Sequence, residues 1–259
     1  MRQIYGTANG KLAIITKIDT ALLSAATQFG CELWVSPHDL RDLTHNALVE
    51  EWTARVGSSP IQTSATKRPK FDRDRMLVVF DGVDDALATS VDLNGASGAT
   101  VCAIVELDSN TATQVLFEYS VAYNSYDGLV FGIDSSAQFW TGMGPGSSSL
   151  SYQNSLKTFP INSRMLLGAQ YDRSVLPNKL NQHYVLHGDA DENLLFSVDK
   201  YGSATTNFGS HLSWLGSRNN GSARVLDGGF GEVMIFREKI PHNEYEEVRR
   251  LIAVKESLL

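Results

Sequence analysis

The chain has 259 residues, of which 42% are hydrophobic and 20% are charged, and its formal net charge is −7. This composition is typical of one large globular domain and excludes a disordered or fibrous protein. The acidic balance, without a basic stripe, excludes nucleic acid as an expected partner, and no run of about 18 apolar residues could cross a bilayer.

Residues 1–30 precede the first clear strand pattern. Within them, residues 11–18 alternate between apolar and polar side chains, which predicts either an extra edge strand or an arm that docks on another subunit. Lys17 and Asp19 interrupt the apolar stretch Leu12–Ala26, so we expect no signal peptide.

From residue 31 onward, short apolar and β-branched runs alternate with turn-forming sequences such as Asp81-Gly82 and Asn94-Gly95. Such runs, without helical periods between them, predict an antiparallel sandwich. The predicted strands are 31–35, 76–80, 100–107, 115–119, 129–133, 138–140, 165–171, 183–187, 194–198, 212–215 and 231–236.

One helix is predicted, over residues 241–259. Pro241 suits the first turn, and the glutamates of residues 244–247 favour the positive end of the helix dipole. Tyr245, Val248 and Ile252 can form an apolar stripe, which we expect to pack on the sandwich.

The chain has two cysteines, Cys31 and Cys102, both within strand-like apolar sequence. Two cysteines are too few to staple a chain of this length or to bind zinc in a cluster. We expect two buried, reduced thiols, which suits a reducing compartment.

Four sequence blocks resemble one known family. They are residues 33–40, with Leu-Trp-Val; residues 49–71, with Trp52 and Gly57; residues 79–87, with Phe-Asp-Gly; and residues 226–236, with Leu-Asp-Gly-Gly-Phe-Gly. Together they resemble the laminin-G-like, concanavalin A-like jelly rolls found in bacterial surface proteins and bacteriophage structural proteins. The resemblance implies an all-β, antiparallel jelly-roll β-sandwich over residues 31–259, with the terminal helix 241–259 and residues 1–30 as an N-terminal arm or extra edge strand.

The resemblance is incomplete after Trp52. Many relatives carry an aspartate there, where this chain has Thr53, Ala54 and Arg55, so no role of that carboxylate is transferred. Glucanases with this fold use a Glu-x-Asp-x-x-Glu strand, which is absent here. We therefore predict no catalytic residues and no enzymatic activity.

Aromatic side chains near loops are candidates for sugar binding, because a ring can stack on the face of a sugar. The candidates are Tyr123, Tyr126, Trp140 and Trp214. The competing interpretation is that these rings only fill the core.

Oxygen-bearing side chains in turns are candidates for calcium binding, since relatives of this kind sometimes hold calcium at the sandwich rim. The candidates are Asp84, Asp85, Asn219 and Asp227. The competing interpretation is that they cap their own turns. No other cofactor is expected.

The resemblance favours a non-enzymatic virion protein, such as a bacteriophage tail, fibre, baseplate or capsid-decoration component. Its expected partners are further copies of itself, other virion proteins and cell-surface glycans, and its expected location is the virion, assembled in the host cytoplasm. The alternative is a secreted bacterial carbohydrate-binding module, and a polysaccharide hydrolase comes third.

Overall fold

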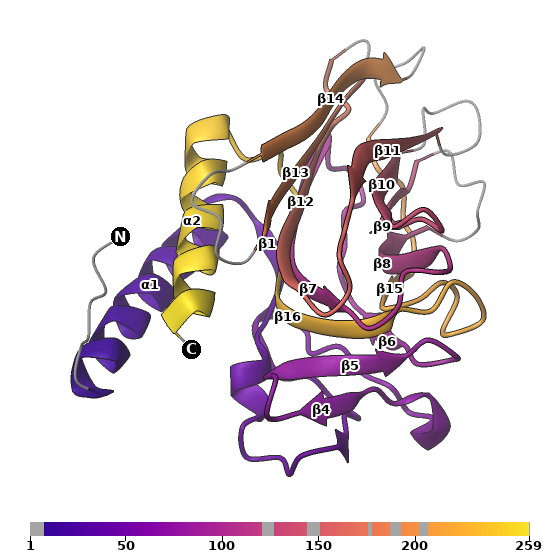
Figure 1. Ribbon diagram of the computed structural model, residues 1–259. Helices are drawn as coiled ribbons and strands as arrows, with labels where there is room; N and C mark the ends of the chain where they lie inside the picture. The colour runs from indigo at the N-terminus through magenta and orange to yellow at the C-terminus, as the bar shows by residue number, and fades with distance from the viewer. Residues whose placement is uncertain are drawn as a thin grey trace.

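The computed structural model describes residues 8–120, 127–143, 151–175, 178–186, 193–201 and 207–258. Two antiparallel β-sheets are stacked face to face, and two helices lie side by side on the far side of one sheet (Figure 1). This arrangement confirms the predicted β-sandwich with a C-terminal helix. Among the described residues, no helix is both long enough and apolar enough to span a membrane.

The larger sheet, here sheet A, has ten strands. Its central strands β12, β7 and β16 are long and almost entirely buried, as expected of strands covered on both faces. In spatial order the sheet contains β14 (Asn193–Tyr201), β13 (Asn178–Leu186), β12 (Arg164–Asp172), β7 (Gly98–Leu107), β16 (Asp227–Phe236), β5 (Leu77–Asp81), β4 (Lys70–Asp72) and β2 (Ala47–Leu48), while β1 (Cys31–Val35) pairs with β16 and with β3 (Ala54–Gly57).

The smaller sheet, here sheet B, has six strands. In spatial order they are β11 (Ser151–Thr158), β10 (Gln138–Met143), β9 (Leu129–Ile133), β8 (Gln114–Tyr119), β15 (Ser213–Leu215) and β6 (Leu87–Thr89). Two short 3₁₀ helices, η1 (Pro37–Leu40) and η2 (Ala65–Lys67), lie in the connections near the N-terminal strands.

Every predicted strand overlaps an observed one, and the strands missed by the prediction are short or polar. The strands β2, β3, β4 and β6 have only two to four residues, too few for an alternating pattern to show. The strand β11 reads Ser-Tyr-Gln-Asn-Ser-Leu-Lys-Thr and offers few apolar residues.

The main core lies between the two sheets. Phe80 and Phe230 of sheet A meet edge to face with ring centroids 5.6 Å apart, and Phe131 and Phe139 of sheet B do so at 4.9 Å. Trp52 is fully buried and donates from its indole nitrogen to the carbonyl of Ser36 (3.0 Å). Aromatic side chains of this size supply much of the apolar area that stabilises a sandwich.

A second core lies between sheet A and the helices α1 (Ala8–Gln28) and α2 (His242–Leu258). Residues 8–28 are helical, so the described part of residues 1–30 forms no edge strand and the prediction is wrong for the run 11–18. Ile14, Ile18, Leu22 and Ala26 recur every four residues, so a helix places them on one face, where the last three are buried. Docking of this segment on another subunit stays a prediction; here it packs on α2 and β1 of its own chain.

The two cysteines form no disulfide, as predicted. Cys102 is fully buried in the second core and Cys31 lies partly buried at its edge. Burial raises the pKa of each thiol to about 12, so both groups stay protonated at neutral pH.

Ion pairs connect the two helices to sheet A. Lys255 of α2 is 1% exposed and lies 2.7 Å from the carboxylate of Glu232 and 2.8 Å from that of Asp19 in α1. Asp19 also contacts Arg55 at 2.9 Å. The indole nitrogen of Trp34 donates to Glu232 at 2.5 Å. We call these five residues the sheet A network; its ion pairs link α1, α2, β3 and β16.

Candidate functional site

The outer face of sheet B, away from the core, carries an unusual set of side chains. Phe117 and Tyr119 of β8 belong to the main core, so Glu118 between them points outward. Directly opposite Glu118 lie Val130 on β9 and Trp214 on β15, and directly paired residues share a face. Glu118, Val130 and Trp214 therefore form one row across this face.

A second row lies two residues along β9. Val115, Gly132 and Trp140 are paired across β8, β9 and β10. A side chain at position 132 would come within 2.8 Å of the Trp140 indole, so glycine is what allows the ring to lie over this strand. The guanidinium of Arg224 lies 5.7 Å from the centre of the Trp140 ring, within range of a cation–π contact.

Glu118 is the acidic group of this face. It is 1% exposed, and its Oε1 accepts hydrogen bonds from Arg218 (2.7 Å) and from the Ser120 hydroxyl (2.8 Å). Its second oxygen, Oε2, has no hydrogen-bond partner within the described part of the chain. A buried carboxylate oxygen is costly to leave unpaired, so this position favours a donor such as a hydroxyl group or water.

Both arginines come from the connection between β15 and β16, residues 216–226. The segment folds back on itself, with Arg218 and Ala223 forming a bridge pair around Asn219-Asn220-Gly221, all three of which have positive φ. Asn and Gly tolerate this backbone region best, which explains the tight turn. The carbonyl of Arg224 accepts from the amide of Val115 (2.8 Å), which anchors the far end to sheet B.

We call Trp140, Trp214, Glu118, Arg218 and Arg224 the sheet B face. Two of the predicted sugar-binding residues, Trp140 and Trp214, belong to it; Trp140 is 3% exposed and Trp214 is partly exposed. The other two, Tyr123 and Tyr126, lie outside the described residues.

The sequence analysis missed the charged members of this face. Glu118 is the only charged residue within the apolar strand sequence Val-Leu-Phe-Glu-Tyr, and a carboxylate there needs a cationic partner. Arg218 and Arg224 flank the Asn-Asn-Gly turn. Arg218 follows its partner Glu118 by 100 residues in the sequence. Only the folded structure brings the three together.

The predicted calcium residues gather in part. Carboxylate oxygens of Asp81, Asp84 and Asp85 lie within 4.8 Å of one another, in the turn after β5. Burial, and then the neighbouring Asp81, raise the pKa of Asp85 from its usual 3.8 to about 6. Asp227 is paired with Asp81 across β16 and β5, and burial together with Asp108 and Asp81 raises its pKa.

Asn219 is exposed, whereas its neighbour Asn220 contacts residues in and near η2. The Asn220 side-chain oxygen accepts from Gln62 (2.9 Å), and its carbonyl accepts from Lys67 (2.8 Å). Asp81 also accepts from the amide of Val83 (2.9 Å), so the predicted turn-capping role of these aspartates is observed alongside the clustering. Calcium binding at Asp84, Asp85, Asn219 and Asp227 stays a prediction.

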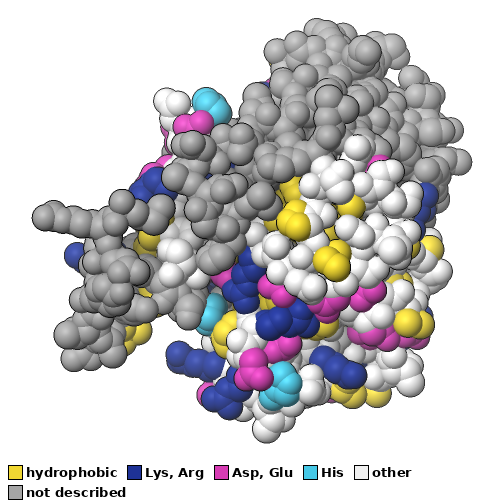
Figure 2. Space-filling model, viewed as in Figure 1, with side chains coloured by type: hydrophobic (Ala, Val, Ile, Leu, Met, Phe, Trp, Pro, Cys, Tyr) yellow, Lys and Arg dark blue, Asp and Glu magenta, His cyan; other side chains and the backbone are white. Residues whose placement is uncertain are grey.

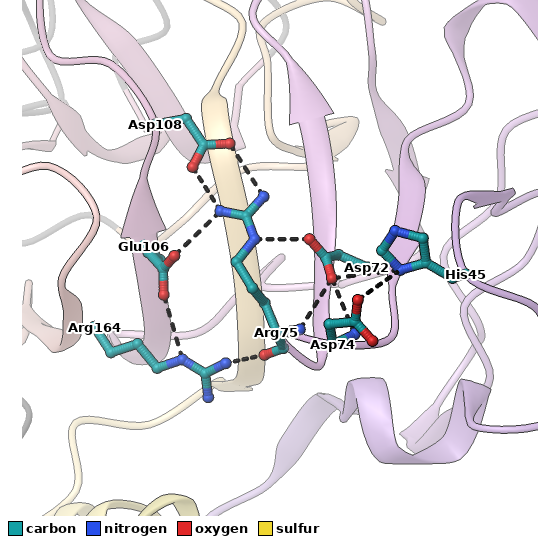
Figure 3. A network of polar contacts seen from close by, with 7 residues as sticks. All are labelled: His45, Asp72, Asp74, Arg75, Glu106, Asp108 and Arg164. Carbon is teal, nitrogen blue, oxygen red and sulfur yellow. Dashed lines mark hydrogen bonds and ion pairs between the residues drawn. The ribbon is translucent and has the colours of Figure 1, made fainter.

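A further polar network lies at the end of β4, β7 and β12, where Figure 3 shows the Arg75 guanidinium between three carboxylates. Arg75 donates to Asp108 (2.6 Å), Asp72 (2.7 Å) and Glu106 (3.1 Å). Arg164 donates to Glu106 (3.4 Å) and to the Arg75 carbonyl. Three carboxylates thus share two guanidinium groups, which is typical of a network that joins strand ends.

His45 and Asp74 complete the set of groups in Figure 3, and with Asp72 they could in principle hold a metal ion. Burial opposes ionisation of Asp72, but hydrogen bonds from Arg75 outweigh it and lower the pKa. Asp72 is thus already committed to Arg75, and Asp74 is 85% exposed. In Figure 2, acidic and basic side chains likewise lie side by side over the lower part of the visible face. We therefore assign this network a structural role.

Comparisons with known proteins define the fold class. No family model matches the sequence, and neither does any curated protein sequence. The structure is similar to the carbohydrate-binding module CBM40 of the Ruminococcus gnavus IT-sialidase bound to α2,3 sialyllactose, with a TM-score of 0.51, 13% identity, and coverage of 69% of this chain and 95% of that one. It is also similar to Trypanosoma rangeli sialidase, with a TM-score of 0.54, 12% identity, and coverage of 96% of this chain and 39% of that one.

At these identities the similarity establishes the fold alone. The chain has the fold of an antiparallel jelly-roll β-sandwich of the concanavalin A-like type, as the four sequence blocks indicated. The present chain matches little more than a third of the length of the trypanosomal sialidase, so nothing about that enzyme's activity carries over from the comparison.

Proposed function

We propose that this chain binds glycans through the sheet B face and performs no catalysis itself. The observation that carries the proposal is the gathering of two tryptophans, two arginines and a buried glutamate on one outer sheet face. Aromatic rings bind the apolar faces of sugars, while carboxylate and guanidinium groups bind the hydroxyl groups that surround them.

The charge on this face favours an acidic glycan. Guanidinium groups bind carboxylates in a planar, two-point geometry that lysine cannot reproduce. Arg224 is the candidate for a ligand carboxylate, because it is partly exposed and its guanidinium lies 5.7 Å from the centre of the Trp140 ring. The match in fold to a module described as bound to α2,3 sialyllactose supports the same choice of ligand.

Among the functions predicted from the sequence, the carbohydrate-binding module is the better supported. The similar structures described above include a sugar-binding module and a sialidase, and they lend no support to a role in a bacteriophage virion. The virion role, its location and self-assembly stay predictions, as does the lack of enzymatic activity.

Trp214→Ala tests the proposal. With α2,3 sialyllactose as titrant, we expect at least about a tenfold loss of affinity in isothermal titration calorimetry, because the partly exposed ring of this face is removed. Leu48→Ala is the matched control: Leu48 is 47% exposed but lies on sheet A. Equal affinity of the Trp214 variant and the wild type would disprove the assignment to this face.

Arg224→Ala tests the preference for acidic glycans. We expect this variant to bind sialyllactose no better than lactose, which has the same neutral part without the carboxylate. If the wild type binds no member of a broad glycan array, including sialylated ones, glycan binding itself is wrong.

A further inference from the structure

A polar cavity of about 490 Å³ lies at one end of sheet A. Its walls come from three neighbouring strands: the segment before β7, the residues after β12 and the residues after β16. Gly98 and Asp172 are register partners and mark where the first two walls meet. The cavity therefore lies where three neighbouring strands of sheet A begin or end, and most of its lining residues belong to the connections beyond those strands.

The lining of the cavity includes four consecutive small residues, Gly95, Ala96, Ser97 and Gly98. Gly95 has φ of +78°, and no atom lies within 4 Å of the place where its side chain would be, so the space above it is open. At Gly98 a side chain would come 2.7 Å from the backbone nitrogen of Lys239, which keeps the two walls close together. Small residues thus create the space.

The walls are held in place by hydrogen bonds. The Arg173 amide donates to the Ser97 carbonyl (2.7 Å), and Arg237 donates to the Asn94 carbonyl (2.8 Å). The Thr100 hydroxyl donates to the Glu238 carbonyl (2.8 Å). A cavity fixed in this way needs little rearrangement to accept a ligand.

The cavity offers hydrogen-bonding groups of both kinds with balanced charge. Lys239 lies 3.0 Å from Asp172, which also accepts from the Ser174 hydroxyl (2.6 Å), so these two charges cancel. Arg237 and Glu238 add one charge of each sign, and the side chain of Ser97 is exposed. No aromatic ring is among the described residues that line the cavity.

We propose that this cavity is a second sugar-binding site that takes a neutral monosaccharide through hydrogen bonds alone. A sugar ring both donates and accepts through adjacent hydroxyls, which suits carboxylates and cations arranged around one space. The volume lies within the range of about 300–1,000 Å³ usual for small-molecule sites. The proposal does not depend on the sheet B face, which uses tryptophan rings and lies on the other sheet.

The site can be tested on the full chain by following backbone amide signals in NMR. D-glucose, D-galactose and D-mannose are titrated separately to millimolar concentrations. We expect at least one of them to shift the amides of Ser97, Ser174 and Glu238 in a saturable way. If none of the three sugars does so, the proposal is wrong.

Ser97→Trp fills the cavity from an exposed position and should abolish the shifts without unfolding the chain. Ser58→Trp places the same ring at another exposed serine and should leave the shifts intact. Glu238→Gln, also at an exposed residue, should weaken the interaction by about threefold to tenfold, because a neutral amide accepts more weakly from hydroxyl groups.

Two further outcomes would overturn the proposal. Shifts produced by inorganic phosphate but by none of the sugars would make the cavity an anion site. Loss of the sugar-induced shifts in Trp214→Ala would place the sugar on the sheet B face instead. Conversely, intact shifts in that variant would support this site even if glycan binding by sheet B fails.

Discussion

The outer faces of the two sheets carry the same chemical groups in different surroundings. On sheet A, Trp34 lies beside Glu232, with Lys255 and Arg55 over its ring at 5.5 and 5.2 Å. On sheet B, Trp140 lies beneath Arg224, and Glu118 pairs with Arg218. Each face thus combines an indole, a buried glutamate and cations.

The difference is in what covers each face. Helices α1 and α2 cover sheet A, and one of them supplies Asp19 and the other Lys255 to the network (Figure 1). Within the described part of the chain no helix covers sheet B, and one oxygen of Glu118 lacks a partner. The sheet B residues are nevertheless mostly buried, with Glu118 1%, Trp140 3% and Arg218 8% exposed. A ligand on this face would therefore first meet Trp214 and Arg224, which are partly exposed.

The largest expected effect is on the covered face. Lys255→Met should lower the free energy of unfolding by about 3–5 kcal/mol, because Glu232 and Asp19 lose their buried partner. Urea denaturation measures this change. The double variant Lys255→Met/Glu232→Gln should recover part of the loss, and a double variant less stable than the single one would contradict the compensation described here.

A smaller effect is expected on the sheet B face. Arg218→Leu should cost about 1–3 kcal/mol, because Glu118 keeps the hydrogen bond from the Ser120 hydroxyl and one carboxylate loses a cation, whereas Lys255→Met affects two carboxylates. The same denaturation series measures it. A loss equal to that of Lys255→Met would contradict the expectation that the cation with two carboxylate partners contributes more to stability.

The smallest effect concerns pH. Burial, followed by the nearby Lys255 and Arg55, lowers the pKa of His38 from its usual 6.5 to about 4. The unfolded chain therefore takes up this proton at higher pH than the folded chain. The contribution of neutral His38 to the free energy of unfolding is fully present above pH 6.5 and is lost as the pH falls toward 4. Because His38 is partly exposed, we expect the loss to be about 1–2 kcal/mol.

His38→Gln should remove this part of the pH dependence, as measured by thermal unfolding at a series of pH values. The carboxylates titrate in the same range, and Asp85, whose pKa is raised to about 6, acts in the opposite direction by favouring the folded state at low pH. The comparison must therefore be between the variant and the wild type at each pH. If the variant and the wild type have the same dependence of thermal stability on pH, burial and the nearby Lys255 and Arg55 do not lower the pKa of His38.

The sequence predicted the sandwich because its long strands are dense in apolar residues and are separated by clear turn sequences. It misassigned residues 8–28 because Lys11–Ile18 fits both a period of two and a period of four, and only the buried stripe Ile18, Leu22 and Ala26 decides between them. A longer window, extending to Phe29, would have favoured the helix.

The candidate site was predictable only in its aromatic residues. Trp140 and Trp214 stand out because tryptophan is rare, with 4 in the chain. Glu118, Arg218 and Arg224 are ordinary residues whose proximity depends on strand pairing and on one connection between the sheets. Long-range pairing of this kind leaves no local signal in a single sequence.

That connection between β15 and β16 sets limits on how the protein can evolve. A side chain at Gly221 would come 1.9 Å from the carbonyl oxygen of Asp84, whereas the neighbouring Ser222 and Ala223 are exposed. Natural variation should therefore accumulate at the two exposed positions and spare the glycine. Any lineage that lost the glycine would have to rebuild the aspartate turn and the arginine positions together.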